Sequence, residues 1–148
     1  MRPPARNRAG ALKAANFVWP VRVYYEDTDA GGVVYYANYL KFMERARTEW
    51  LRALGFEQTA LLRDYGIKFA VRAVALEYLK PALFNDLLEI TVEPPHVRGS
   101  LIEAGQAVLR GTETLVAGRT EVVCLNTRSF KPVRIPSPIV EKLKTRNA

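Results

Sequence analysis

The chain has 148 residues, of which 49% are hydrophobic and 25% charged, so it is long enough to form one globular domain with a buried core. No apolar run approaches the roughly 18 residues that a membrane-spanning helix needs, and no continuous apolar segment follows the arginine-rich start as it would in a secretory signal. The only cysteine, Cys124, excludes an internal disulfide and is typical of a reducing compartment, so we expect a cytoplasmic protein.

The net charge of +7 is concentrated at the two ends of the chain. Residues 1–16 carry four basic residues and no acid, residues 131–148 carry five basic residues and one acid, and the rest is nearly neutral. Nucleic-acid-binding proteins usually gather basic residues on one face of the fold, so we expect no nucleic-acid partner. The ends could still attract phosphates or an anionic membrane loosely. We predict that residues 1–16 form a disordered basic arm and that residues 17–148 form a single domain.

The first half of the domain is expected to hold a short strand and a long helix. Alternating apolar residues predict a strand over residues 21–25, which ends at three acids. Apolar residues then recur every three or four positions from Asn38 to Leu54, as on one face of an amphipathic helix. Asn38 is the predicted N-cap and Gly55 the predicted terminator. A shorter helix is predicted over residues 58–65, with Gly66 as its terminator.

Strand-like segments follow Gly66 and are separated by prolines and glycines. They cover residues 69–79, 86–93, 100–109 and 115–126, and a last helical turn or two is expected near the end, over residues 139–144. One long helix with a sheet of about five antiparallel strands predicts an α+β sandwich. Apolar residues occur on both faces of the first of these strands, which favours a symmetric oligomer that covers the second face.

Most catalytic arrangements are excluded by the scarcity of reactive residues. The only histidine, His96, follows two prolines at an expected strand-to-strand turn, so a Ser/His/Asp or Cys/His site is improbable. Cys124 lies in the last apolar strand, which favours a buried, unreactive position. One cysteine and one histidine cannot close a zinc site, and no phosphate-binding glycine motif is present. We therefore expect neither a metal ion nor a cofactor.

The remaining chemical candidate is an acid cluster that comes directly before the long helix. Glu26, Asp27 and Asp29 are followed by Gly31 and Gly32, which allow a substrate to approach the backbone closely. The helix start offers unpaired N–H groups and a partial positive charge. A carboxylate that faces such donors can attack an acyl carbonyl or activate water, which suits cleavage of a thioester. An ordinary surface loop with solvated acids is the alternative.

The stretch YYEDTDAGGVVYYANYLKFMERARTEWLR strongly resembles the YbgC-type acyl-CoA thioesterases that are associated with the Tol–Pal system of Gram-negative bacteria. More broadly, it is similar to the 4-hydroxybenzoyl-CoA thioesterase branch of the hotdog-fold superfamily. The match is dense over residues 19–56 and continues loosely to about residue 136. The resemblance implies a hotdog fold, in which the antiparallel sheet wraps the long helix. It also implies dimers with shared active sites, often paired into tetramers.

The resemblance also assigns roles to single residues. The catalytic carboxylate of the family falls on Asp29, a tyrosine that helps to shape the site on Tyr25, and the carbonyl-polarising backbone N–H on Tyr36. Many YbgC-type members have a histidine where this chain has Tyr36, so a role for an imidazole does not carry over. The candidate substrate-binding residues are Gly31, Gly32, Val33, Val34, Asn38 and Tyr39, and the candidate residues for the coenzyme A phosphates are Arg98, Arg128 and Lys131.

We therefore expect hydrolysis of an acyl-CoA thioester to free acid and coenzyme A, with Asp29 as nucleophile or general base. Coenzyme A is then part of the substrate and not a cofactor. One alternative is hydrolysis of acyl groups on acyl carrier protein, an acidic partner that suits the basic ends. Another is a low-turnover protein that binds acyl thioesters or lipid enzymes in the Tol–Pal and phospholipid machinery, at the periphery of the inner membrane. The expected assembly is a dimer or a dimer of dimers.

Overall fold

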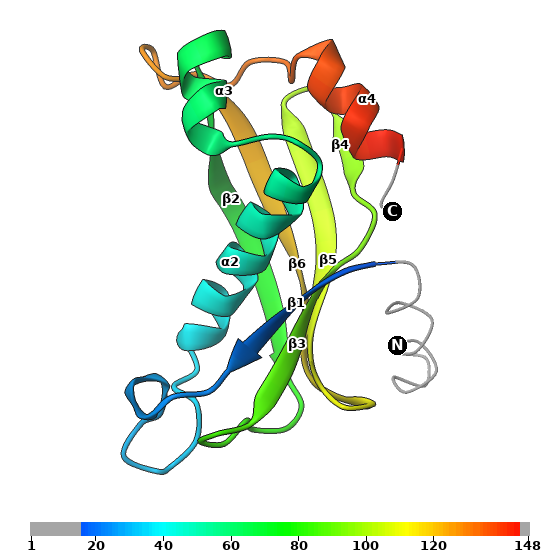
Figure 1. The fold of residues 1–148 in the computed structure, drawn as a ribbon. Coiled ribbons are helices and arrows are strands. Elements are labelled where there is room, and N and C mark those ends of the chain that lie inside the picture. Colours follow the sequence, from blue (N-terminus) through cyan, green and yellow to red (C-terminus); the bar gives the residue numbers. More distant parts are fainter. Residues whose placement is uncertain (1–15, 146–148) are drawn as a thin grey trace.

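The computed structural model describes residues 16–145, so the predicted basic arm over residues 1–16 lies outside the described residues except for Asn16. The strands curve around α2, which lies along one face of the sheet (Figure 1). In chain order the elements are β1 (Phe17–Arg22), the short 3-10 helix η1 (Tyr25–Asp27), α2 (Asn38–Ala53), α3 (Gln58–Tyr65), β2 (Ile67–Tyr78), β3 (Leu87–Val92), β4 (His96–Arg98), β5 (Leu101–Arg110), β6 (Glu113–Asn126) and α4 (Ser137–Thr145).

All strand pairs in the sheet are antiparallel, and the order across it is β1-β3-β5-β6-β2, with β4 paired to β5. β2 and β6 form a long ladder that runs from the Ile67–Asn126 pair to the Tyr78–Val116 pair. The expected α+β architecture is confirmed, and β4 brings the sheet to 6 strands. β2 is the last strand on its side, so its outer edge has no partner strand within residues 16–145.

The ends of the two consecutive helices follow from local sequence. At the end of α2 the amide of Gly55 donates to the carbonyl of Arg52, and the amide of Phe56 donates to that of Leu51, both at 2.9 Å. This pair of hydrogen bonds requires a residue in the left-handed backbone conformation, and Gly55 has a φ of +97°. Gly66, with a φ of +66°, ends α3 in the same left-handed region. Both predicted terminators are confirmed.

The strand predicted over residues 21–25 is wrong at both ends, because β1 already begins at Phe17. The strand β1 stops at Arg22, and Tyr25 lies in η1 instead of on the strand. The cause is the carboxylate of Asp27, which accepts the amide of Tyr24 at 2.8 Å and stabilises a 3-10 turn here.

Two single-residue predictions about element ends are also wrong. The N-cap position of α2 is occupied by Ala37, and Asn38 is the first helical residue. His96 does not lie in a turn but begins β4, where it pairs with Glu103 of β5. A strand of only 3 residues is too short to produce a detectable alternation of apolar side chains.

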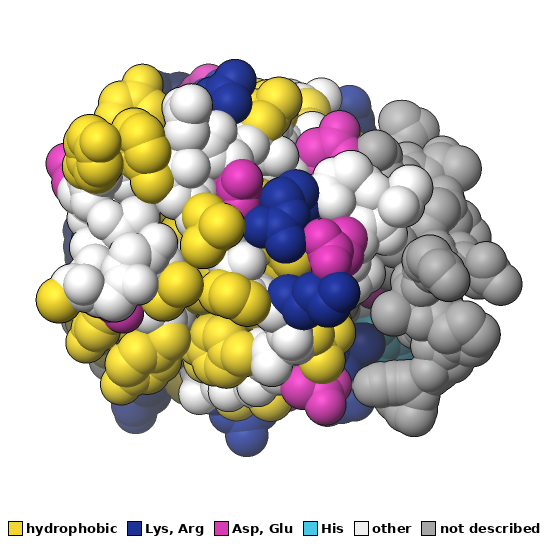
Figure 2. Space-filling view, turned by 90° about the horizontal axis from the view of Figure 1, so that it is seen from below, with side chains coloured by type: hydrophobic (Ala, Val, Ile, Leu, Met, Phe, Trp, Pro, Cys, Tyr) yellow, Lys and Arg dark blue, Asp and Glu magenta, His cyan; other side chains and the backbone are white. Residues whose placement is uncertain are grey.

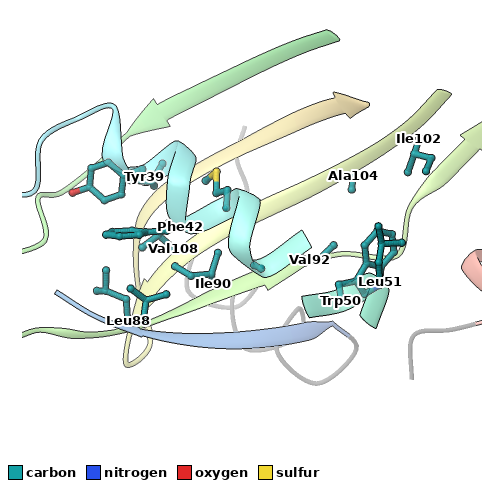
Figure 3. Close-up of a cluster of buried hydrophobic side chains, with 14 of the residues drawn as sticks. Tyr39, Phe42, Trp50, Leu51, Leu88, Ile90, Val92, Ile102, Ala104 and Val108 are labelled. Carbon is teal, nitrogen blue, oxygen red and sulfur yellow. The ribbon is translucent and has the colours of Figure 1, made fainter. Parts of the chain in front are cut away.

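The core is formed where the apolar stripe of α2 packs on the sheet. Figure 3 shows Phe42 of α2 close to Leu88 and Ile90 of β3, and all three are fully buried. Cys124 of β6 is also fully buried, and its burial raises the pKa of the thiol to about 11. Within residues 16–145, no helix is long and apolar enough to cross a membrane. The buried stripe of α2 comprises Tyr39, Phe42, Met43, Ala46, Trp50 and Leu51.

Candidate active site

The loop between η1 and α2 holds the carboxylate of Asp29 at the surface. The amide of Asp29 donates to the carbonyl of Val33 at 2.9 Å, and the amide of Gly32 donates to the carbonyl of Asp29 at 3.0 Å. One carboxylate oxygen, Oδ1 of Asp29, accepts the amide of Gly31 at 2.8 Å. The Asp29 carboxylate has no further hydrogen bond to the described residues. One of its oxygens is therefore held, and the other is available to a substrate or to water.

The two glycines of this loop have different tasks. Gly32 has a φ of +85°, which other residues rarely adopt. A Cβ atom on Gly31 would lie only 3.2 Å from Oδ1 of Asp29, so a side chain there would press on the carboxylate. The first glycine gives room to Asp29, and the second allows the chain to turn toward α2.

The neighbouring acid Asp27 has a structural task. Its carboxylate accepts the amide of Tyr24, and its carbonyl accepts both the amide of Tyr35 at 2.9 Å and Nδ2 of Asn38 at 3.0 Å. Asp27 therefore ties the acid loop to the start of α2. Of the three acids in the cluster, Asp29 is the one whose carboxylate is exposed and close to the glycine turn.

Of the predicted backbone donors over residues 34–36, two are already bonded within the described residues. The amide of Val34 donates to the carbonyl of Ala82, and the amide of Tyr35 donates to that of Asp27, both at 2.9 Å. The amide of Tyr36 has no hydrogen-bond partner in the part of the chain that the structure describes. The carbonyl of Tyr35 belongs to the same peptide unit and accepts the amide of Asn38 at 2.8 Å, which fixes the direction of the Tyr36 N–H. The predicted group of N–H donors over residues 34–36 is thus reduced to Tyr36.

Aromatic side chains surround this donor. The ring of Tyr36 lies against those of Tyr35 and Tyr78, and the hydroxyl of Tyr78 donates to the Tyr36 carbonyl at 3.0 Å. Tyr25 is 74% exposed and stacks on Phe84, with ring centroids 3.8 Å apart. Figure 2 views the end of the molecule that carries this loop, and shows hydrophobic side chains gathered around a few charged ones.

Asn38 and Tyr39 are buried at the start of α2. They are only 8% and 3% exposed. The hydroxyl of Tyr39 accepts the amide of Ala82 at 3.0 Å, and burial raises the pKa of this phenol, so it stays protonated at neutral pH. Val34 is buried as well, and Val33 forms an isolated bridge with Leu83. These residues support the loop, while Gly31 and Gly32 are exposed next to Asp29.

The three candidate phosphate-binding residues lie far from Asp29 within one chain. Arg128 and Lys131 belong to the loop after β6, at the end of the sheet where Ile67 pairs with Asn126. The Asp29 loop is at the opposite end of the sheet (Figure 1). Arg98 ends β4 and is exposed, as are the other two.

Sequence reasoning did not identify Tyr78 and Ala82 as supports of the site. Both come from the segment around the end of β2, far along the chain from Tyr36, and no local spacing connects them. Within residues 16–145, no group of at least three His, Cys, Asp or Glu side chains is arranged to hold a metal ion.

Comparisons with known proteins identify the family of this chain. A family model described as the thioesterase superfamily matches residues 31–117. An acyl-CoA thioesterase YbgC from Haemophilus influenzae is 46% identical over 123 residues, covering 83% of this chain and 90% of that protein. An acyl-CoA thioester hydrolase YbgC from Escherichia coli O157:H7 is 46% identical over 129 residues, covering 86% of this chain and 96% of that protein.

Solved structures share the fold. A probable thioesterase from Bartonella henselae superposes with a TM-score of 0.79 at 37% identity, covering 82% of this chain and 100% of that one. A 1,4-dihydroxy-2-naphthoyl-CoA thioesterase from Synechocystis reaches a TM-score of 0.81 at 19% identity, with 88% and 96% covered, and supports the fold alone. The chain therefore belongs to the thioesterase superfamily and, within it, to the YbgC-type acyl-CoA thioesterases of hotdog fold.

Proposed function

We propose that this protein hydrolyses an acyl-CoA thioester to the free acid and coenzyme A, with Asp29 and the Tyr36 amide as the catalytic groups. The observation that carries the proposal is that the exposed Asp29 carboxylate shares one loop with the Tyr36 amide, which is the one amide of residues 34–36 without a partner among the described residues. Relatives that are 46% identical bear the names acyl-CoA thioesterase and acyl-CoA thioester hydrolase, which supports this substrate class.

In this mechanism the Tyr36 N–H donates to the thioester carbonyl oxygen. Negative charge develops on that oxygen as the carbonyl carbon becomes tetrahedral, and a fixed donor at the positive end of α2 stabilises it. As general base, Asp29 takes a proton from water while the water oxygen attacks. The C–S bond then breaks, and coenzyme A leaves as a thiolate that is protonated.

As nucleophile, Asp29 instead attacks the carbonyl carbon itself. The C–S bond breaks, coenzyme A leaves as its thiolate, and an acyl–aspartyl anhydride forms. Water hydrolyses this anhydride in a second step to the free acid and the Asp29 carboxylate, and the thiolate takes up the proton that is released. The bond from Gly31 to Oδ1 leaves Oδ2 to act in either route. Rapid-quench mass spectrometry separates the routes, since only the nucleophilic route adds the mass of the acyl group to the peptide that contains Asp29.

The proposed activity is tested by thiol release from short-chain, long-chain and aromatic acyl-CoAs. Turnover of at least one class is expected. Saturable binding without thiol release from any of them would favour the low-turnover binding protein instead. Rates on coenzyme A and acyl carrier protein thioesters of the same acyl chain decide between these two carriers. The single buried Cys124 supports a cytoplasmic location, and sedimentation with inner-membrane vesicles tests for peripheral association.

We also propose a two-fold dimer in which the outer edges of two β2 strands pair. Val71, Val74 and Tyr78 of this edge strand are between 42% and 52% exposed, which is unusual for apolar residues on one strand. Beside them a groove between α2 and β2 contains Glu44 and Arg47. The pKa of Arg47 is lowered by burial, and within residues 16–145 its guanidinium donates only to Gln106, so a carboxylate from a second copy is a suitable partner.

Antiparallel pairing of two β2 strands would also complete the site. It places the Ile67 end of one chain next to the Tyr78 end of the other. The partner's Arg128 and Lys131 then approach the Asp29 loop, where they can meet coenzyme A phosphates. Analytical ultracentrifugation tests the dimer, and Val74→Lys is expected to shift it toward monomer and to weaken coenzyme A binding.

A further inference from the structure

We propose that Asn38 and Tyr39 are positioning residues, which hold the Tyr36 amide at a fixed place relative to the Asp29 carboxylate. They are the first two residues of α2, and neither side chain faces the loop surface. The inference rests on the proposed function, because it explains how the donor and the carboxylate in that function keep their relative geometry.

Asn38 connects the acid loop to the peptide unit that carries the donor. Its Nδ2 donates to the carbonyl of Asp27, two residues before Asp29, at 3.0 Å. The backbone amide of Asn38 donates to the carbonyl of Tyr35, and the amide of Tyr35 donates to the carbonyl of Asp27. The Asp27 carbonyl therefore accepts two bonds, and the Tyr35–Tyr36 peptide unit is fixed from the side of the acid loop.

Tyr39 fixes the same segment from its other side. Its hydroxyl accepts the amide of Ala82 at 3.0 Å, and the carbonyl of Ala82 accepts the amide of Val34 at 2.9 Å. Ala82 is fully buried, so these bonds have no competition from water. The Tyr39 ring also lies 5.7 Å from that of Tyr78, whose hydroxyl bonds the Tyr36 carbonyl.

The exposed acid loop needs support from buried residues if its catalytic groups are to keep a fixed geometry. Residues 29–32 are exposed and include two glycines, and Tyr36 is exposed as well, so the loop has little packing of its own to keep the Asp29 carboxylate and the Tyr36 amide at a fixed separation. Catalysis by a fixed donor depends on its position before the reaction begins. Two buried side chains on a rigid helix can supply that position.

The principal test is Tyr39→Phe, which removes one hydroxyl and keeps the ring against Phe42 and Tyr78. Loss of a single oxyanion donor lowers kcat by roughly a hundredfold or more, so a displaced donor should lower it by about tenfold, with KM changed less than about twofold. Tyr65→Phe at the exposed end of α3 is the matched control and should leave both constants unchanged.

Binding of two unreactive analogues separates positioning from a general structural effect. An alkyl-CoA thioether lacks the carbonyl oxygen, and a 2-oxoalkyl-CoA retains a carbonyl near that place. Tyr39→Phe should weaken only the 2-oxoalkyl analogue, measured by calorimetry. Equal weakening of both analogues, or a kcat equal to that of the parent, overturns the proposal for Tyr39.

Asn38→Asp provides a second, independent variant if Tyr39→Phe does not fold. It keeps the shape, and a negative charge suits the first turn of a helix, but it replaces the Nδ2 donor by an acceptor that faces the Asp27 carbonyl. The same selective loss of carbonyl-dependent binding is expected, and unchanged selectivity would contradict the role of Asn38. The parent protein and Asp29→Asn are assayed in parallel and test the proposed function separately. If the parent shows no turnover, the proposed hydrolysis is contradicted, whereas the positioning role is judged from the analogue binding of the Tyr39 and Asn38 variants.

Discussion

The two ends of α2 satisfy their backbone groups in opposite ways. At the C-terminal end the amides of Gly55 and Phe56 find carbonyl partners in the last turn of the same helix. Before the N-terminal end the amide of Val34 donates to Ala82, which lies far along the chain, and the amide of Tyr36 is left unpaired within the described residues. The C-terminal end is bonded by residues close to it in the sequence, whereas the segment before the N-terminal end is bonded in part by residues that are distant in the sequence.

The difference explains why the chemistry is expected at only one end. A helix end whose groups are all paired locally offers nothing to a ligand. Before α2 the amides of Val34 and Tyr35 are occupied by Ala82 and Asp27, and the next amide, that of Tyr36, has no partner among the described residues. A carboxylate on the preceding loop then makes this end suitable for acyl transfer.

The largest effect is expected from Asp29→Asn, which removes the charge but keeps an oxygen for the Gly31 amide. We expect kcat/KM to fall by roughly a thousandfold, or about 4 kcal/mol of transition-state stabilisation, with the fold intact by circular dichroism. Asp27→Asn is the control and should be much milder. Parent-like turnover in the Asp29 variant would remove this residue from the mechanism.

The two ends can be compared directly with Gly32→Ala and Gly55→Ala. Both glycines have positive φ, +85° and +97°, so each change introduces backbone strain of roughly 1–2 kcal/mol. Both variants should show a lower Tm in thermal unfolding. Only Gly32→Ala should also lose about tenfold in kcat, because it moves the loop that holds Asp29. A similar loss of kcat in the Gly55 variant would mean that the C-terminal end also influences the site.

The smallest effect is expected from Tyr78→Phe, which removes the hydroxyl that bonds the Tyr36 carbonyl at 3.0 Å. That carbonyl lies in the peptide unit after the proposed donor, so its release should loosen the donor only slightly. Loss of one partly exposed hydrogen bond should lower kcat by about two- to fivefold in the thiol-release assay. A loss as large as that of Asp29→Asn would assign Tyr78 a direct role in the reaction.

Several features could be predicted because they depend on neighbours in the chain. The apolar period of 38–54 and the glycines at 55 and 66 predicted two helices and their C-terminal ends, and the structure confirms these. The first strand was misplaced because the short polar bond from Tyr24 to Asp27 overrides the alternating pattern. β4 was missed because it is too short to show a period.

The sequence by itself determined the acid loop, the glycine pair and the helix that follows, since these rest on spacing and on the conformational freedom of glycine. Only the tertiary structure decided which amide of residues 34–36 lacks a partner among the described residues, and that the Asp27 carboxylate is bonded to the backbone while that of Asp29 is exposed. That choice depends on Ala82 and Tyr78, which approach the loop through the sheet. Asn38 and Tyr39 illustrate the difference, because their spacing is equally compatible with binding substrate and with supporting the site. Their buried long-range hydrogen bonds favour support.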